Sequence, residues 1–282
     1  MRKVNLDALI PSEDFEVKED SKINLGTSIN TIDINGLKKN SFFYAFLRKP
    51  DFQRETNEWE PKKVVGLIQS FVEGNLIPSL ILWKASGDYI FTIDGAHRLS
   101  AILAWINDDY GDGDISKDFF ENISDEQAKI AQQTRELVNS IVGPFGQYEL
   151  ATTSPKSIDA KIVQNSRALG IRAFPLQWVN GNAEVAEQSF LTINQEATPI
   201  NPTEKKLIEC RNKPNSISAR AIRRSGTGHK YWAKFDEEKQ NDIEKIAKEI
   251  NDLIFVPPFK KPVKTLDLPI AGDQNSSKSL QI

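Results

Sequence analysis

A strand that runs through a glycine turn into a helix is the pattern that most constrains this chain. Residues 90–94 are mostly apolar and β-branched, which is typical of a buried strand. Apolar residues then recur on one helical face between positions 99 and 106. Gly95 lies between the two elements, where a tight turn favours a residue without a side chain. Because the first backbone N–H groups of a helix lack intrahelical acceptors and the helix dipole adds positive charge there, the turn predicts an anion site.

The side chains of the turn suit that chemistry. The turn reads Asp94-Gly95-Ala96-His97-Arg98. Arg98 can bind phosphate oxygens in bidentate geometry and stays charged at any working pH. His97 can donate a hydrogen bond or exchange a proton near neutrality. The same residues also fit an ordinary connection, in which Asp94 caps the helix and two solvated side chains follow.

Composition limits the partners. The chain has 282 residues, enough for one large domain or two smaller ones, and its net charge of −3 provides no global field for nucleic acid. Any DNA contact would need a local basic patch. The single cysteine, Cys210, excludes an intrachain disulfide and a Cys-rich zinc site. Without an apolar signal region or a run long enough to span a membrane, the sequence predicts a cytoplasmic protein.

The remaining patterns predict an α+β fold. Alternating residues indicate a short strand within 28–34, and residues 40–47 fit either a strand or a short helix. Apolar runs predict strands, and apolar residues that recur about every 3.6 positions predict helices. The last expected helix, over 236–254, has Ile243, Ile246, Ile250 and Leu253 on its inner face. The strands are expected over 80–83 and 171–179, the helices over 61–73, 124–140, 158–169, 183–193, 214–224 and 236–254, and a loop over 143–157.

The acidic loop 108–114 resembles the start of a calcium-binding EF-hand. Its carboxylates stand at the first, second, fifth and seventh positions, and Phe119 occupies the twelfth, where an EF-hand needs Glu. We therefore expect a solvated turn rather than a calcium site.

Four blocks of sequence resemble a known family. Residues 93–100, with the turn Asp94 to Arg98, resemble the Asp-Gly-Gln-His-Arg or Asp-Gly-Gln-Gln-Arg motif of the ParB/sulfiredoxin-like superfamily. Upstream, Phe52-Gln53-Arg54, Trp59, the predicted helix to Gly74 and Ile77-Pro78 are similar to the N-terminal domain of GmrSD-type restriction enzymes. Downstream, residues 190–195 look like the Phe-x-x-Ile-Asn segment of those domains. The ordered set of blocks is more specific than the five-residue motif alone.

The resemblance implies a ParB/sulfiredoxin-like small mixed sheet with surrounding helices, and a nucleoside triphosphate (ATP, CTP or GTP) at the turn. Carried over residue by residue, Gly95 and the N–H groups of Ala96 to Arg98 would hold phosphate, and His97 and Arg98 would neutralise it. Further contacts would come from Gln53, Arg54 and Asn194. Asp94 would hold Mg²⁺ or orient a water, with His97 as its catalytic partner, although Asp94 would equally serve only as a cap.

At one position of the motif the chain differs from the sulfiredoxins, and the difference argues against their activity. Sulfiredoxins carry a nucleophilic cysteine in the sequence Gly-Cys-His-Arg, whereas this chain has Ala96 at that position. Reduction of sulfinic acids is therefore not expected.

A basic, glycine-containing loop is the second candidate site. Five basic side chains fall within eleven positions, beside Tyr231 and Trp232, which favours contact with DNA phosphates. The same loop could supply a second half of the nucleotide site, or be a solvated turn beside the acidic helix that follows. The basic residues are Arg220, Arg223, Arg224, His229 and Lys230.

These observations define a domain plan and a function. We predict an N-terminal arm over 1–39, a ParB-like nucleotide-binding domain over 40–195 with an insertion at 106–170, a helical region over 196–256 and an extended or disordered tail over 257–282. The predicted function is binding and hydrolysis of a nucleoside triphosphate by a protein that acts with DNA in a DNA-modification, restriction or antiphage system. A separate nuclease or DNA-modification protein is the expected partner, and no membrane is involved. A non-catalytic DNA-binding regulator of the same fold is the alternative, and a nuclease component ranks third.

Overall fold

The computed structural model describes most of the chain, in two compact units. The first unit comprises residues 1–11, 16–49 and 56–190, and the second comprises 12–15, 50–55 and 191–282. The described residues are 3–13, 15, 29–50, 53, 56–57, 59–85, 89–120, 122–197, 210, 213–223, 225–227, 230 and 232–255. The domain boundaries predicted from the sequence stay a prediction.

A mixed sheet forms one part of the first unit. Its strands follow the order β3-β5-β4-β6-β2 across the sheet. Strand β5 runs parallel to β3 and antiparallel to β4, β6 runs parallel to β4, and β2 runs antiparallel to β6. The predicted α+β fold is confirmed. The strands are β2 (Thr31–Asp33), β3 (Leu47–Pro50), β4 (Leu80–Lys84), β5 (Ile90–Asp94) and β6 (Ala173–Val179).

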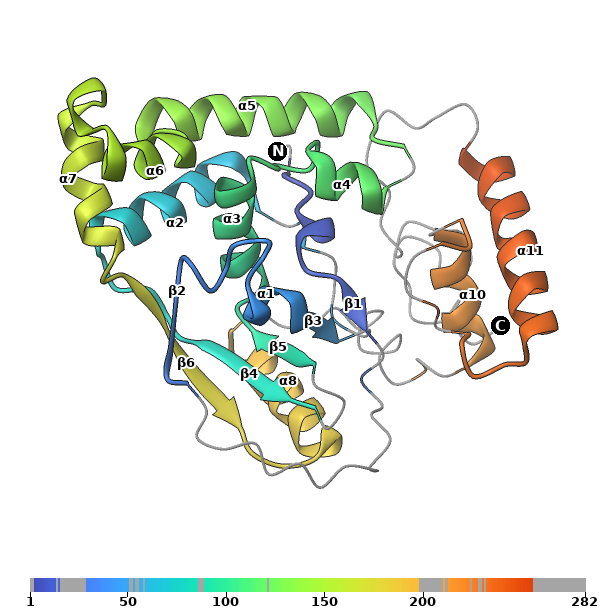
Figure 1. Cartoon of the computed structure of the whole chain (residues 1–282). Helices are drawn as coiled ribbons and strands as arrows, with labels where there is room; N and C mark the ends of the chain where they lie inside the picture. The colour runs from blue at the N-terminus through green and yellow to red at the C-terminus, as the bar shows by residue number, and fades with distance from the viewer. Residues whose placement is uncertain are drawn as a thin grey trace. The chain divides into compact units, whose positions relative to one another are not determined.

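Helices form the other part of the first unit. Figure 1 shows α2, α5, α6 and α7 gathered at one end, the strands at the other, and α3 running between them. Helix α8 (Ala183–Ala197) begins in the first unit and ends in the second. The other helices are α1 (Phe42–Phe46), α2 (Pro61–Glu73), α3 (Ala96–Asn107), α4 (Asp114–Phe119), α5 (Asp125–Ile141), α6 (Phe145–Thr153) and α7 (Ala160–Leu169), with 3₁₀ turns η1 (Asp7–Leu9) and η2 (Pro155–Ser157).

Helix α3 is the centre of the core. Residues 99–105 are all buried, so the helix is covered on every side rather than on the single face that the sequence pattern indicated. Trp105 donates its indole N–H to the Gly143 carbonyl oxygen at 2.9 Å. A buried tryptophan needs such a partner, and this bond joins α3 to the end of α5.

Helix α2 begins and ends at the residues that the sequence marked. Pro61 occupies its first position, and Gly74 ends it in the left-handed region with φ of +81°. The Gly74 N–H is shared between the Ser70 and Phe71 carbonyl oxygens. The guanidinium of Arg172 lies where a side chain at position 74 would stand, but it is the end of a flexible side chain, so glycine is favoured there mainly by the backbone conformation.

The N-terminal segment lies in the core of the first unit. Val4, Leu6, Leu9 and Ile10 are buried. Backbone hydrogen bonds join the Val4 N–H to the Trp59 carbonyl oxygen and the Leu6 N–H to that of Thr56. Tyr44 donates its hydroxyl to the Leu9 carbonyl oxygen, and burial raises the pKa of Tyr44 to about 12. Residues of the predicted arm thus help to build the core.

The predicted loop over 143–157 is wrong, because this stretch forms α6 and η2. Phe145, Tyr148 and Ala151 are buried at a spacing of three residues, and Tyr148 donates its hydroxyl to the Val142 carbonyl oxygen. The Gly143-Pro144 pair reads as a loop signal but serves here as the stop of α5 and the start of α6.

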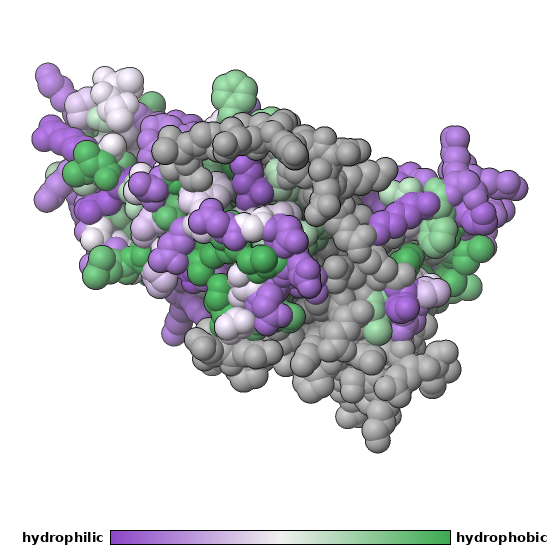
Figure 2. All heavy atoms as spheres, turned by 90° about the horizontal axis from the view of Figure 1, so that it is seen from below, coloured by the Kyte–Doolittle hydropathy of each residue, from purple (hydrophilic) through white to green (hydrophobic). Residues whose placement is uncertain are grey.

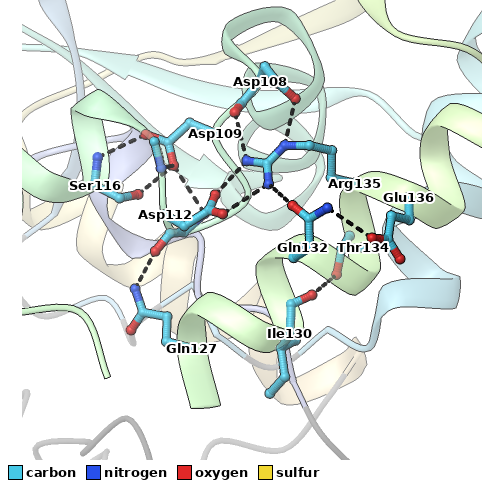
Figure 3. A network of polar contacts seen from close by, with 12 residues as sticks. Asp108, Asp109, Asp112, Ser116, Gln127, Ile130, Gln132, Thr134, Arg135 and Glu136 are labelled. Atoms are coloured by element: carbon cyan, nitrogen blue, oxygen red, sulfur yellow. Dashed lines mark hydrogen bonds and ion pairs between the residues drawn. The ribbon is translucent and has the colours of Figure 1, made fainter. Parts of the chain in front are cut away.

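The acidic loop 108–114 is built into the fold, so the expected solvated turn is wrong for Asp109. Asp109 is buried and accepts four hydrogen bonds, from the N–H groups of Gly111, Gly113 and Ser116 and from the Ser116 hydroxyl. Figure 3 shows the neighbouring Asp108 and Asp112 turned toward Arg135 of α5. The Arg135 guanidinium lies 2.9 Å from an Asp108 oxygen and 2.6 Å from an Asp112 oxygen. These carboxylates therefore join the loop to α5.

The second unit contains β1 (Ser12–Glu13) and a helical pair, α10 (Pro214–Arg223) and α11 (Glu237–Phe255). Ala221, Ile222, Trp232 and Ala247 form its buried cluster. Two of the apolar positions predicted for the inner face of α11 are exposed, Ile246 at 53% and Leu253 at 83%. In the part that the structure describes, α11 packs mainly against α10, with Ile243, Ala247 and Ile250 at the buried cluster.

The described surface mixes polar and apolar side chains. On the face shown in Figure 2, apolar residues are interspersed with hydrophilic ones. Among the helices that the structure describes, we find none with the length and apolar character needed to cross a membrane.

Candidate anion site at the start of helix α3

The turn between β5 and α3 places a helix N-terminus without a side-chain cap. Gly95 is the N-cap residue, with φ of +102° and ψ of 8°, and it makes no side-chain cap hydrogen bond. The first intrahelical bond runs from the Leu99 N–H to the Gly95 carbonyl oxygen at 2.9 Å. The N–H groups of Ala96, His97 and Arg98 therefore come before the first bond of the helix. The alternative in which Asp94 caps the helix is wrong.

Gly95 is needed for both conformation and space. Residues that carry a side chain rarely adopt this φ value. A Cβ atom at position 95 would also stand 2.5 Å from the Leu80 Cδ2 atom and 3.1 Å from the Arg98 Nη2 atom. The Arg98 guanidinium consequently lies close above the turn backbone, at the start of α3.

Arg98 is held at two points by one of its nitrogen atoms. Nη2 donates to the Asp94 Oδ2 atom at 2.6 Å and to the Ser79 carbonyl oxygen at 3.0 Å. The Nε atom is buried and has no hydrogen-bond partner. A buried donor without an acceptor destabilises a fold by about 1–3 kcal/mol. An oxygen atom of a bound anion would satisfy this donor.

His97 lies against an aromatic ring that the sequence analysis did not select. The rings of His97 and Trp59 are stacked, with centroids 5.7 Å apart and an interplanar angle of 27°. The Lys63 ammonium, from the first turn of α2, lies 4.6 Å from the centroid of Trp59. The available signal was the position of Trp59, two residues before the first residue of α2 and thus close to a helix N-terminus.

Two buried hydroxyls flank the turn. Thr92 on β5 and Ser100 on α3 are fully buried, and neither side-chain oxygen has a hydrogen-bond partner. Native folds contain few such atoms, and each one indicates a bound water, a ligand or stored strain. Together with the Nε atom of Arg98, these are three buried polar atoms without a hydrogen-bond partner within nine residues of sequence.

The other residues predicted for the nucleotide site are not part of this turn. Gln53 belongs to the second unit, where its N–H bonds the Pro50 carbonyl oxygen and its Oε1 atom is buried without a partner. Arg54 lies outside the described residues. Asn194 lies in the last turn of α8, and its side chain is outside the described part. The predicted roles of these three residues stay predictions.

The basic loop of the second unit offers less free charge than its sequence indicates. Arg220 on α10 is buried. Lys230 forms an ion pair with Glu244 at 2.6 Å, and Trp232 donates its indole N–H to the same carboxylate at 3.1 Å. The hydrogen bond from Lys230, followed by that from Trp232, lowers the pKa of Glu244.

The other basic side chains of this loop are not among those that the structure describes. Arg224 and His229 lie outside the described residues, as does the side chain of Arg223. Contact between this loop and DNA stays a prediction.

The described residues contain no group of three or more His, Cys, Asp or Glu side chains placed to hold a metal ion. At the turn, Asp94 is the carboxylate that the sequence analysis assigned to Mg²⁺, and its Oδ2 atom already accepts from Arg98. A metal ion bound there would need its other ligands from a nucleotide, which is the usual arrangement for Mg²⁺ in nucleotide sites.

Comparison with known proteins assigns the chain to a family. Residues 32–212, well over half of the chain and including the β5–α3 turn, match the model of the GmrSD restriction endonuclease N-terminal domain. Neither the comparison with curated proteins nor the comparison with solved structures found a match. The match agrees with the blocks of sequence on either side of the turn and indicates a restriction system as the biological context. The chain therefore belongs to the GmrSD N-terminal domain family.

Proposed function

We propose that this domain binds a nucleoside triphosphate through the start of α3 and hydrolyses it, within a restriction system that acts on DNA. The observation that carries the proposal is the Arg98 guanidinium, which is fixed above an uncapped helix N-terminus and keeps a buried donor without an acceptor. Backbone N–H groups, the helix dipole and an arginine at one point are the elements from which phosphate sites are built.

The residues of the turn fit a phosphate chain in chemical character. Without a side chain at Gly95, the Arg98 guanidinium lies close to the turn backbone, and Ala96 adds only a methyl group. Arg98 retains the N–H groups on Nε and Nη1 after Nη2 has bonded Asp94 and Ser79. His97, stacked on Trp59, can donate a hydrogen bond or move a proton near neutral pH. Mg²⁺, when bound with the nucleotide, would neutralise phosphate charge.

Binding tests the proposal directly. Titration of the full chain with fluorescent analogues of ATP, CTP and GTP is expected to show saturable binding. Arg98→Ala is expected to raise the Kd by about 10- to 100-fold, because a hydrogen bond to a charged group contributes about 1.5–3 kcal/mol. Arg98→Lys is expected not to restore binding, since an ammonium cannot reproduce the planar fork of donors. Arg167→Ala, which removes an exposed arginine of α7, is the matched control. Unchanged affinity in folded Arg98→Ala protein would contradict the assignment.

Hydrolysis is tested separately at His97. His97→Phe keeps an aromatic ring against Trp59 but carries no exchangeable ring proton, so it separates stacking from proton transfer. We expect phosphate release to fall by at least about 100-fold, within the range typical of a lost general acid or base, while nucleotide binding is retained. Turnover equal to that of the wild type would show that His97 does no chemistry. A wild-type chain that binds nucleotide but releases no phosphate would favour the alternative, a regulator without catalysis.

A further inference from the structure

We propose that Asp94 is a positioning residue, whose carboxylate holds the Arg98 guanidinium above the start of α3 so that it meets an incoming phosphate in a fixed orientation. This inference rests on the proposed nucleotide site. It gives Asp94 a task that does not depend on a metal ion and that differs from capping the helix.

Two hydrogen bonds fix the Arg98 guanidinium, one to the last residue of a strand and one to the residue before another strand. Asp94 is the last residue of β5, and Ser79 directly precedes β4. Both give an acceptor to Nη2, at 2.6 Å from Asp94 Oδ2 and 3.0 Å from the Ser79 oxygen. The two N–H bonds of Nη2 are thereby used, and the group cannot rotate without breaking one of these contacts.

Gly95 supplies the surface on which the guanidinium lies. The space that a Cβ atom would take at this position reaches to 3.1 Å from Arg98 Nη2. The Arg98 side chain is only 18% exposed, so it is packed as well as bonded. An arginine that is free to move loses up to about 2 kcal/mol of rotamer entropy on binding a ligand, and holding it in place beforehand removes much of that loss.

A carboxylate beside a phosphate site needs a reason, because it repels the ligand. Metal binding is one reason, but a metal ion would need its other ligands from the nucleotide, because the described residues bring no second and third His, Cys, Asp or Glu ligand to Asp94. The carboxylate instead points an oxygen at Arg98 with a short, charge-assisted bond. Orientation of the arginine therefore accounts for Asp94 without a further group.

A second ion pair in the same unit provides a matched control. Asp112 and Arg135 are also joined at 2.6 Å, and their side chains are 19% and 17% exposed. This pair joins the acidic loop to α5, as Figure 3 shows, and it is not part of the β5–α3 turn. Asp112→Ala thus removes an equally short carboxylate–arginine contact outside the proposed site.

The experiment is calorimetric titration of the full chain with ATP and with inorganic tripolyphosphate, each in Mg²⁺ and in EDTA. Asp94→Ala is expected to raise the Kd for both ligands by about tenfold, with and without Mg²⁺, because the bond that orients Arg98 is lost. Asp94→Asn keeps an oxygen that accepts from Nη2, so its Kd is expected to stay within about threefold of the wild-type value. Asp112→Ala is expected to lower the Tm and leave both Kd values unchanged.

Three results would overturn the inference. Equal Kd values for Asp94→Ala and the wild type would show that the ion pair does not orient Arg98. Loss of only the Mg²⁺-dependent part of binding, in Asp94→Ala and Asp94→Asn alike, would make Asp94 a metal ligand. Failure of the wild-type chain to bind either compound would overturn the proposed function itself, and is distinguished from the other two because it does not involve the variants.

Discussion

Replacing Lys49 by methionine is expected to lower the free energy of unfolding by about 3–5 kcal/mol, because it leaves a buried carboxylate without its cation. Lys49 lies on β3 with its side chain 1% exposed, and it forms an ion pair with Asp7, whose side chain is 6% exposed. The Lys49 ammonium also donates to the Asp7 carbonyl oxygen at 3.0 Å and the Thr56 hydroxyl at 3.3 Å. Denaturant unfolding of the purified variant measures the loss.

An exposed ion pair of the same unit is the control. Lys38 lies 2.9 Å from Glu149, and these side chains are 40% and 52% exposed. Lys38→Met is expected to change stability by less than about 1 kcal/mol. The double variant Asp7→Asn/Lys49→Met should recover part of the lost stability, because no unpaired charge then remains buried. A Lys49→Met protein as stable as Lys38→Met would show that the buried pair contributes little.

The second large effect is expected at Gly95. Gly95→Ala is expected to lower the free energy of unfolding by about 2–4 kcal/mol, from the left-handed backbone conformation together with the crowding of Leu80 and Arg98. Because the new methyl group also displaces the guanidinium of Arg98, nucleotide affinity should fall in the protein that remains folded. Thermal unfolding and nucleotide titration at a temperature well below the Tm separate the two effects.

Gly66→Ala tests the same substitution where neither constraint applies. Gly66 lies inside α2, and no heavy atom stands within 4 Å of the position that its Cβ would take. An alanine there is expected to stabilise the protein by about 0.5–1 kcal/mol, the difference in helix propensity. If Gly95→Ala behaved like Gly66→Ala, the strained turn would not be needed for the fold or for the site.

The strand, turn and helix around Gly95 could be predicted because each has a strong local signal. β5 is a short apolar run, α3 has regular apolar spacing, and a glycine joins them. The limits of α2 were equally local, with Pro61 at one end and Gly74 at the other. Such signals lie within a few residues of one another, so they do not depend on contacts with distant parts of the chain.

Features that depend on distant contacts could not be predicted. The burial of Lys49 follows from its bond to Asp7, 42 residues away, and no residue near Lys49 in the sequence indicates that partner. The acidic loop gave no sign that Asp109 is buried or that Arg135, on α5, would bond Asp108 and Asp112. The stacking of His97 on Trp59 likewise brings together the starts of two helices, α3 and α2. In each case the sequence around one residue does not indicate which distant residue it contacts.

The buried N-terminal segment has a consequence for how the chain folds during synthesis. Asn5 donates its side-chain amide to Gln127, 122 residues further along. At about 5–20 residues per second, Gln127 is made roughly 6–24 s after Asn5. During that interval Val4, Leu6, Leu9 and Ile10, which the finished fold buries, are present without α5 and the hydrogen bond that it makes to Asn5. The N-terminal segment can therefore reach its full set of contacts only after α5 has been made, and its apolar side chains are open to other contacts until then.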